Sequence, residues 1–396
     1  MILFPTPSVS IAFRTGVVLA ACLTTPSLHA QTDNGLTSMD SYRRPQERIH
    51  LILPEIPGFK TLKCDFHMHT VFSDGQVWPG VRVQEAWYEG LDAICITDHI
   101  EYQPHVKDVP TQHNRPYELA KEPAAEMDIL LIKGSELTRE TPPGHFNALF
   151  VDDCAALDAG KGPDADKEAI RKAVAQKAFV FWNHPGWKVR QIPQSYEWIP
   201  FVDEVHKQGN LHGIEVMNGF GFHRKALDWC VDKSLAVLGN TDIHTLTGHE
   251  YDFTIGRTRT MTLVFAKERN TEAIREALQS ARTVAWSSEH LAGPENLVRA
   301  LFDGAVEVGP IHHQSAKGIG FVEVTNRSDL TFKLVKAGGP AGLAETLTLN
   351  PRRSVLLKGA NIGKLMEETR WKVANAFIRS DRNLETTLVS QTKTPE

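Results

Sequence analysis

Short apolar runs of strand length alternate with amphipathic helical stretches between residues 61 and 290, and this alternation limits the folds open to the chain. Strands that are apolar along their whole length indicate a parallel sheet that is buried on both faces. The expected strands are Leu62–His67, Ala93–Thr97, Ile129–Leu137, Phe146–Val151, Ala178–Trp182, Gly213–Met217, Ala236–Asn240 and Met261–Phe265. The expected helices include Val81–Glu89, Lys167–Gln176, Phe222–Lys233 and Thr271–Ala281. About seven or eight such units over roughly 230 residues predict a closed, irregular β/α barrel.

The regions that flank this alternation have a different texture. Residues 31–60 are polar and contain prolines, with one strand-like run at Ile49–Leu53, so we expect a linker and an edge element there. The barrel should occupy residues 61–298. From about residue 299, apolar and polar residues alternate, as in IGFVEVTNRSDLTFKLV, with turn-forming residues between the runs. We therefore expect an α/β protein whose residues 299–396 form a small C-terminal antiparallel β domain.

The N-terminus has the pattern of an export signal. Arg14 precedes a short apolar run, Gly16–Leu23, and a signal-peptidase site follows near Ala30, which predicts a signal peptide over residues 1–30. The run is too short to span a bilayer, so we expect no transmembrane helix. The segment ending at Cys22 also resembles a bacterial lipobox, which would anchor the protein by a lipid, and a disordered N-terminus is the remaining alternative. We expect an exported, periplasmic protein.

Histidine is the unusual residue of the composition, with 17 copies among 396 residues. Such an excess directs attention to metal chemistry. The formal net charge of -5 gives no reason to expect a nucleic-acid partner. The cysteines form no CxxC pair, so a thiolate zinc site is not expected.

Ionisable side chains gather at the ends of the expected strands. The C-terminal strand ends form the active site of a β/α barrel, and residues two apart on a strand point the same way. The side chains at these ends are His67, His69, Asp98, His99, Glu136, His184, Asp242 and His244, while His145 begins the fourth run and Glu215 lies in the sixth. Nearby, Asp74 lies in a Ser-Asp-Gly sequence.

Each of these residues has an ordinary interpretation when it is taken alone. A single histidine in a strand is usually a hydrogen-bonded core residue, Asp74 suits a turn, and Glu136 could cap a helix. All of these interpretations would have to hold together at one end of the barrel. Burying so many ionisable groups without a counter-charge is costly, whereas bound cations turn carboxylates and neutral imidazoles into ligands. The pattern as a whole therefore predicts a metal site.

The motifs HxHT…SDG, TDH, GxE, GHxN, NHP and DxH, in this order, resemble those of the PHP (polymerase and histidinol phosphatase) superfamily of metal-dependent phosphoesterases. The resemblance covers roughly residues 61 to 290 and implies a distorted (β/α)7 barrel with two or three divalent ions, commonly Mn, Zn or Fe. Carried over by motif, it implies a first ion bound by His67, His69, Glu136 and Asp242, a second by Glu136, His145 and His184, and a third by Asp74, His99 and His244. Asp74 is a departure, because some members use histidine near this position.

The run from Cys64 to His105 also resembles the exported bacterial phosphodiesterases of the Sb-PDE family, which act on organophosphate diesters. The expected chemistry is the hydrolysis of a small-molecule phosphodiester by a hydroxide that bridges two ions. The alternatives are a phosphomonoesterase and a carbamate or amide hydrolase on the same metal scaffold. Oligomerisation through the C-terminal domain and shielding of the substrate by it both remain open.

Three further residues are candidates for proton transfer or substrate binding. Asp98 precedes His99 and could orient an imidazole or accept a proton, although a structural capping role is an equal alternative. His105 and Arg139 lie in segments that should reach the top of the barrel, and we expect one of them to assist the leaving group.

Overall fold

The structure, a computed structural model, describes residues 47–312, 315 and 318–389 of the chain. The expected signal peptide, including Cys22, and most of the expected linker lie outside these residues. No helix in the described ranges is both long enough and apolar enough to cross a membrane.

The barrel is formed by seven strands in the order β1-β2-β3-β4-β5-β6-β8. Their bounds are β1 Lys60–Asp65, β2 Ala93–Ile96, β3 Leu130–Leu137, β4 Phe146–Leu149, β5 Phe179–Trp182, β6 Gly213–Asn218 and β8 Ala236–Asn240. The ring closes just beyond β1 and β8, where Met68 and Ile243 form a parallel bridge. There the Asp242 amide donates to the His67 carbonyl at 2.8 Å, and the His69 amide donates to the Ile243 carbonyl at 3.0 Å. The expected α/β class and distorted barrel are confirmed.

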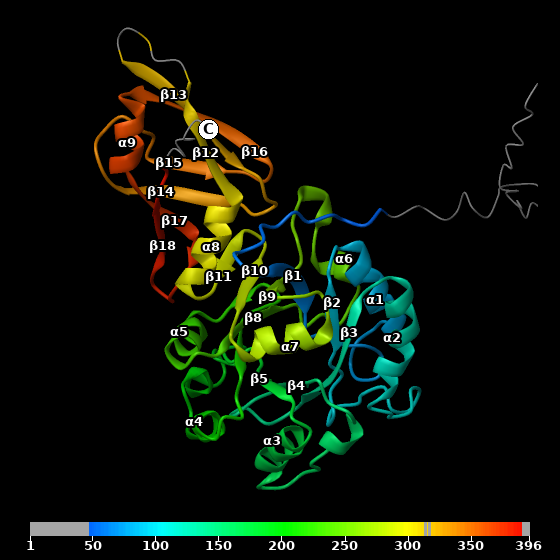
Figure 1. Cartoon of the computed structure of the whole chain (residues 1–396). Coiled ribbons are helices and arrows are strands. Elements are labelled where there is room, and N and C mark those ends of the chain that lie inside the picture. The colour runs from blue at the N-terminus through cyan, green and yellow to red at the C-terminus, as the bar shows by residue number, and fades with distance from the viewer. Residues whose placement is uncertain (1–46, 313–314, 316–317, 390–396) are drawn as a thin grey trace, which may run out of the picture. The chain divides into compact units, whose positions relative to one another are not determined.

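Helices surround the barrel on its outside (Figure 1). They are α1 Pro79–Tyr88, α2 Arg115–Glu126, α3 Ala165–Ala175, α4 Pro200–Lys207, α5 Arg224–Lys233, α6 Thr247–Glu250 and α7 Thr271–Gln279. α7 illustrates why they form: the Asn270 side chain accepts the Ala273 amide at its start, and Ile274, Ala277 and Leu278 are buried against the sheet.

The direction of two strands differs from the expected parallel arrangement. β4 runs antiparallel to both β3 and β5, and β9 (Met261–Ala266) runs antiparallel to β1. The prediction of a fully parallel sheet is therefore wrong at these strands. The loop over residues 138–145 is shorter than the dozen or so residues that a parallel crossover needs, so β4 reverses direction. This reversal brings His145, at the start of β4, to the same end of the barrel as the C-terminal ends of the parallel strands.

The C-terminal region forms two small antiparallel sheets, as expected. One has the order β12-β13-β16, and the other contains β15, β14, β17 and β18. Their bounds are β12 Val306–His312, β13 Ile319–Asn326, β14 Phe332–Gly338, β15 Thr346–Leu349, β16 Arg353–Ala360, β17 Arg370–Phe377 and β18 Asn383–Thr387, with α9 at Ile362–Glu368. Helix α8 (Glu295–Ala305) leads into them and crosses the boundary expected at residue 299.

The second of these sheets is hydrogen-bonded to the barrel sheet. Strand β9 pairs with β10 (Thr283–Ser287), which pairs with β11 (His290–Ala292), and β11 pairs in parallel with β17. Packing reinforces the junction, because the rings of Phe222 and Phe377 lie 5.0 Å apart and the Arg224 guanidinium lies over both. The barrel and the C-terminal domain therefore share one continuous sheet.

The expected strand-like run at Ile49–Leu53 is not a strand. The Ile49 amide donates to the carbonyl of Tyr88, and the Ile52 amide donates to the carboxylate of Asp329 at 2.6 Å. These partners lie on a helix end and a turn instead of a neighbouring strand, so the segment is extended but outside any sheet.

Candidate metal centre

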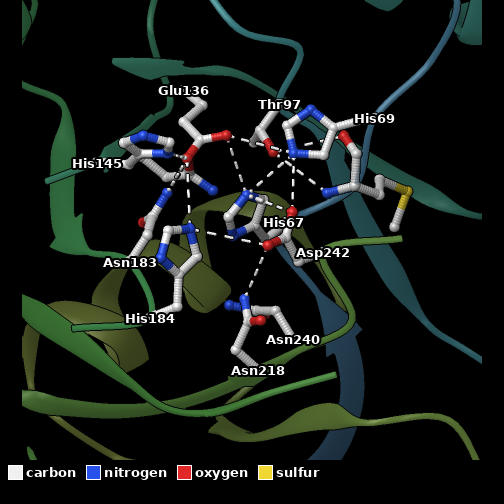
Figure 2. A network of polar contacts seen from close by, with 12 residues as sticks. His67, His69, Thr97, Glu136, His145, Asn183, His184, Asn218, Asn240 and Asp242 are labelled. Atoms are coloured by element: carbon white, nitrogen blue, oxygen red, sulfur yellow. Dashed lines mark hydrogen bonds and ion pairs between the residues drawn. The ribbon is translucent and has the colours of Figure 1, made fainter. Parts of the chain in front are cut away.

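All nine predicted metal ligands lie together at one end of the barrel (Figure 2 shows six of them). Their donor atoms form four groups, each within 4.8 Å, and the groups are His67, His184 and Asp242; His67, His69 and Glu136; His99, Glu136 and His145; and His69, Asp74, His99 and His244. Four residues belong to two groups each, so the groups overlap and form one cluster. We call these nine side chains the metal centre.

The geometry matches the expected first set of ligands. Oδ1 of Asp242 lies 3.1 Å from Nε2 of His67 and 3.0 Å from Nε2 of His69. The two imidazole Nε2 atoms are 3.1 Å apart, and Oε2 of Glu136 is 3.2 Å and 3.3 Å from them. Each of the two carboxylate oxygens thus lies within 3.3 Å of both imidazole nitrogens, a spacing compatible with ligands of one ion.

The expected second set shares Glu136 with the first set, and the expected third set lies beside the first. Oε1 of Glu136 is 2.8 Å from Nδ1 of His145 and 3.7 Å from Nε2 of His184, while its Oε2 lies near His67 and His69 (Figure 2). The donor atom of His184 is grouped with those of His67 and Asp242, which differs from the expected second set. Oδ1 of Asp74 lies 3.2 Å from Nε2 of His244 and 3.5 Å from Nε2 of His99. His69 joins this third group, which the motifs did not indicate.

Surrounding hydrogen bonds fix the orientation of the imidazoles. Nδ1 of His67 is 2.8 Å from the Glu215 carboxylate, which leaves Nε2 to face the centre. Glu215 also accepts the His184 amide and the side-chain amides of Asn218 and Asn240. Nδ1 of His244 is bonded to the Asp242 carbonyl at 2.7 Å, so its Nε2 points inward. Such outer contacts select the tautomer of a metal-binding histidine.

The backbone is strained at two of these positions. His184 has φ 26° and Asp242 has φ 54°, values in the left-handed region that residues with a Cβ rarely adopt. The turn with Asp74 is also tightly constrained, because a Cβ at Gly75 would lie 2.6 Å from the backbone of His69. Glycine is therefore required where this turn folds back on the end of β1.

The charges of the centre are balanced only by imidazoles. Burial raises the pKa of the Glu136 carboxyl, but His99, His67 and His145 hold it well below its usual value. Burial lowers the pKa of His99, yet Glu136 and Asp74 raise it to about 10. Burial, together with His99 and His244, lowers the pKa of His69 to about 3 against the opposing effect of Asp242 and Glu136. The imidazoles therefore cannot all carry a proton at neutral pH.

No lysine or arginine is recorded within ion-pair distance of these nine side chains in the described parts of the chain. Three carboxylates and six imidazoles with inward nitrogens are a donor set that divalent Mn, Zn and Fe accept. The residues present therefore fit two or three divalent cations.

A network of arginines and carboxylates lies next to the metal centre, and we call it the arginine network (Asp65, Arg82, Glu85, Glu89 and Arg259). Arg259 is 1% exposed, and its guanidinium donates to Asp65 at 2.5 Å and to Glu89 at 2.7 Å. The Asp65 carboxylate in turn accepts the His67 amide and the Thr241 hydroxyl.

Arg82 connects the two histidine pairs of the metal centre. Its guanidinium donates to the carbonyls of His69, Ile243 and Thr245 at 2.9, 3.0 and 2.7 Å, and it also pairs with Glu85. Arg82 thus holds together the two segments that follow β1 and β8. These segments carry His67, His69, Asp242 and His244. Sequence reasoning did not find this role, because the partners of Arg82 are backbone carbonyls about 160 residues away.

The three predicted catalytic residues lie in different places. The Asp98 carboxylate accepts the amide and hydroxyl of Thr70 at 2.6 and 2.5 Å and the Ser73 hydroxyl at 2.6 Å, so it holds the turn that carries Asp74. Arg139 pairs with Glu101 in an adjacent cavity, and His105 is half-buried outside the metal cavity. Roles of these residues in the reaction stay predictions.

A cavity of about 300 Å³ opens over the centre. Its lining consists of Asp74, His99, Tyr102, Glu136, Thr138, His145, His184, Trp187, Asn218, Asp242 and His244. Asn218 ends β6, so the rule that strand ends form the site could have identified it from the sequence. Trp187 and Tyr102 supply exposed aromatic walls.

This chain is similar to one family model, one relative and two solved structures. Residues 306–389 match the family model DUF5001, which is described as an Ig-like domain. An uncharacterized protein of Methanocaldococcus jannaschii, MJ1295, is 36% identical over 83 residues; the match spans 20% of this chain and only 36% of that relative. A solved structure of an amidohydrolase from Chromobacterium violaceum is 15% identical over 47% of this chain and 89% of that chain, with a TM-score of 0.36, which is too low to carry an argument.

The second solved structure comes from Bacteroides vulgatus and is described as a two-domain protein containing a predicted PHP-like metal-dependent phosphoesterase. It is 43% identical to this chain, with a TM-score of 0.79, over 86% of this chain and 98% of that chain. The likeness therefore includes both the barrel and the C-terminal domain. Identity at this level across two domains, together with the gathered ligands, establishes that this chain belongs to the family of PHP-like metal-dependent phosphoesterases.

Proposed function

We propose that the metal centre hydrolyses phosphodiesters of small organic alcohols. The observation that carries this proposal is the lining of the metal cavity, which contains no lysine or arginine among the described residues. A phosphomonoester is largely a dianion at neutral pH, and enzymes that bind it usually supply cationic side chains besides their metals. A diester carries only one negative charge. It therefore needs fewer positive charges from the protein than a monoester does, which suits a cavity without lysine or arginine.

The nine side chains of the metal centre would hold the ions, with the Glu136 carboxylate shared between groups. Divalent ions held close together supply Lewis acidity to the phosphoryl group and lower the pKa of water. The chain itself contributes orientation: the Thr138 hydroxyl lines the cavity and can donate to a phosphoryl oxygen, while the Asn218 side-chain amide donates to Glu215 and Asp242 and holds these carboxylates in place. Trp187 and Tyr102 form walls that limit access of bulk water to one side.

The test is a panel of p-nitrophenyl substrates on manganese-loaded protein. A methyl p-nitrophenyl phosphodiester, the monoester, a triester and a carbamate share one leaving group, so their kcat/KM values can be compared directly. We expect the diester to exceed the monoester by at least ~10-fold in kcat/KM, since the missing cations penalise the dianion. Faster turnover of the monoester, or turnover of the carbamate alone, would contradict the proposal.

A matched pair of variants separates the metal centre from trace contamination. Glu136→Gln removes the shared ligand and should abolish diester hydrolysis. Glu126→Gln makes the same chemical change on the exposed surface of α2 and should leave the rate unchanged.

A further inference from the structure

A second cavity of about 470 Å³ continues from the metal cavity. The two cavities share Tyr102, Thr138 and His145 in their linings, so they form two lobes of one cleft. The second lobe, which we call the polar pocket, is enclosed by segments near residues 101, 139 and 160–166 and by Lys188. Its volume falls in the range of pockets that bind small molecules, about 300–1,000 Å³.

The polar pocket contains a buried guanidinium with spare hydrogen-bonding capacity. Arg139 is 8% exposed, pairs with Glu101, and donates to the Gly160 carbonyl at 3.3 Å. Its Nε has no hydrogen-bond partner, and the nearest carboxylate oxygen, on Asp166, is 3.9 Å away. Buried polar atoms are nearly always hydrogen-bonded in folded proteins, so this unpaired N–H leaves the guanidinium incompletely bonded behind the wall of the pocket.

The charges around the pocket are mixed and nearly balanced. Lys161, Lys188 and Arg139 supply three positive charges, and Glu101, Glu140 and Asp166 supply three carboxyl groups. Within the described parts of the chain, Lys161, Lys188 and Glu140 form no ion pair. The three carboxylates would repel an anionic ligand, and the lysines would repel a cationic ligand. A neutral group that both donates and accepts hydrogen bonds can satisfy both.

Aromatic surface completes the pocket. Trp187 and Tyr102 are about half exposed, at 49% and 50%, and lie at the metal cavity from which the polar pocket opens. Nζ of Lys188 lies over the Trp187 ring, 4.4 Å from its centre, so the ammonium covers this face of the ring. The half-exposed ring of Tyr102, which lines both cavities, supplies the apolar face at the polar pocket. An apolar face flanked by donors and acceptors suits a ring that has C–H groups on its face and hydroxyls at its edge.

We propose that the polar pocket binds a polyhydroxylated alcohol, of the size of a hexose, that is esterified to the phosphate held at the metal centre. This inference rests on the proposed function, because it names one of the two alcohols of the diester. The phosphate would lie in the metal cavity, and the hydroxyls would bond to Lys161, Lys188 and Glu140, which line the polar pocket. The simple aromatic and alkyl esters would lack these bonds.

Binding of two matched, non-hydrolysable phosphonates to the manganese-loaded protein tests the pocket separately from catalysis. One carries a hexose ring, and the other carries a cyclohexyl ring on a linker of the same length. We expect the dissociation constant of the hexose phosphonate, measured by titration calorimetry, to be at least ~10-fold lower, since two or more hydrogen bonds of about 1 kcal/mol each are added. Equal or tighter binding of the cyclohexyl compound, or binding of neither, would overturn the inference.

A charge-neutral double variant then assigns the effect to this pocket. Lys161→Ala with Glu140→Ala should weaken the hexose phosphonate by roughly 5-fold and leave the cyclohexyl compound unchanged. The control is Lys121→Ala with Glu122→Ala, an exposed pair on α2. If the pocket variant weakens the binding of both ligands equally, the pocket does not recognise the hydroxyl groups of the hexose. Monoesterase activity in the p-nitrophenyl panel combined with a retained hexose preference would instead refute the diesterase proposal alone.

Discussion

The metal centre and the arginine network are neighbouring clusters of buried charge, and they differ in how that charge is compensated. In the arginine network, Asp65 and Glu89 share the guanidinium of Arg259, and Glu85 pairs with Arg82. In the metal centre, the ion-pair partners of Asp74, Glu136 and Asp242 among the described residues are all imidazoles, and neutral side chains such as Asn183 and Asn218 donate the remaining hydrogen bonds. Buried carboxylates require compensation in both places.

The two kinds of compensation suit two different roles: the arginine network stabilises the fold, and the metal centre can bind ions. Arginine is always protonated, so the arginine network is complete as soon as the chain folds. Imidazoles bind either a proton or a metal ion, so the compensation of the metal centre depends on what the solution supplies. The arginine network fixes the backbone at His67, His69 and Ile243, and the metal centre built on that backbone remains open to ions and substrate.

Removal of the guanidinium from the arginine network should have the largest effect. Arg259→Met leaves the carboxylates of Asp65 and Glu89 buried without their cationic partner, and breaking a buried ion pair in this way costs about 3–5 kcal/mol of the free energy of unfolding. Urea denaturation of the metal-free protein measures this cost. Arg171→Met removes an exposed arginine that pairs with Glu168 on α3, and it should leave the free energy of unfolding unchanged within the error of the measurement. Similar results for the two variants would show that the network is not a structural cluster.

Metal removal is the corresponding change at the metal centre. Manganese at ~100 times its dissociation constant should raise the free energy of unfolding by about 2.7 kcal/mol, and a chelator should reverse this gain. Glu136→Gln should lose most of the gain, while Glu126→Gln should keep it. A wild-type protein that unfolds at the same temperature with and without manganese would refute the idea that ions complete this cluster.

The link between the two clusters can be tested through Arg82, which contacts the carbonyls of His69 and Ile243 but none of the ligand side chains. Arg82→Lys keeps the charge but cannot reach three carbonyls at once. We expect a loss of ~10–100-fold in metal affinity, as is typical when a supporting contact is removed. Calorimetric titration with manganese measures the affinity, and Arg115→Lys on the exposed start of α2 is the matched control. Unchanged affinity would mean that the two clusters are independent.

Asp74 should give the smallest effect, because its side chain is 23% exposed and is the most solvated carboxylate of the metal centre. Asp74→Asn should weaken the ion bound with His99 and His244 roughly tenfold and leave the other ions in place. Elemental analysis at limiting metal concentration counts the ions. Full occupancy in the variant would show that Asp74 is a turn residue and that the centre holds two ions.

The sequence allowed prediction of the ligands because each is adjacent to an apolar strand and the barrel brings strand ends together. It did not reveal that β4 runs antiparallel, since hydrophobic periodicity does not record direction. The pairing of Asp65 with Arg259 could not be predicted either, because the two residues are separated by 194 positions and meet only through the closed barrel. Glu215 was visible in its strand, but its role as the partner of His67 depends on which nitrogen faces the centre.

The pairing of β11 with β17 has a consequence for how this protein can be divided. A chain cut before residue 306 would keep β11 and its pairing with β10 but lose β17, so the other edge of β11 would have no neighbouring strand. Unpaired strand edges recruit other chains, so the excised barrel should aggregate or form mixed oligomers even though it keeps all nine side chains of the metal centre. In this fold the Ig-like domain therefore covers the edge of β11 and protects it from pairing with strands of other chains.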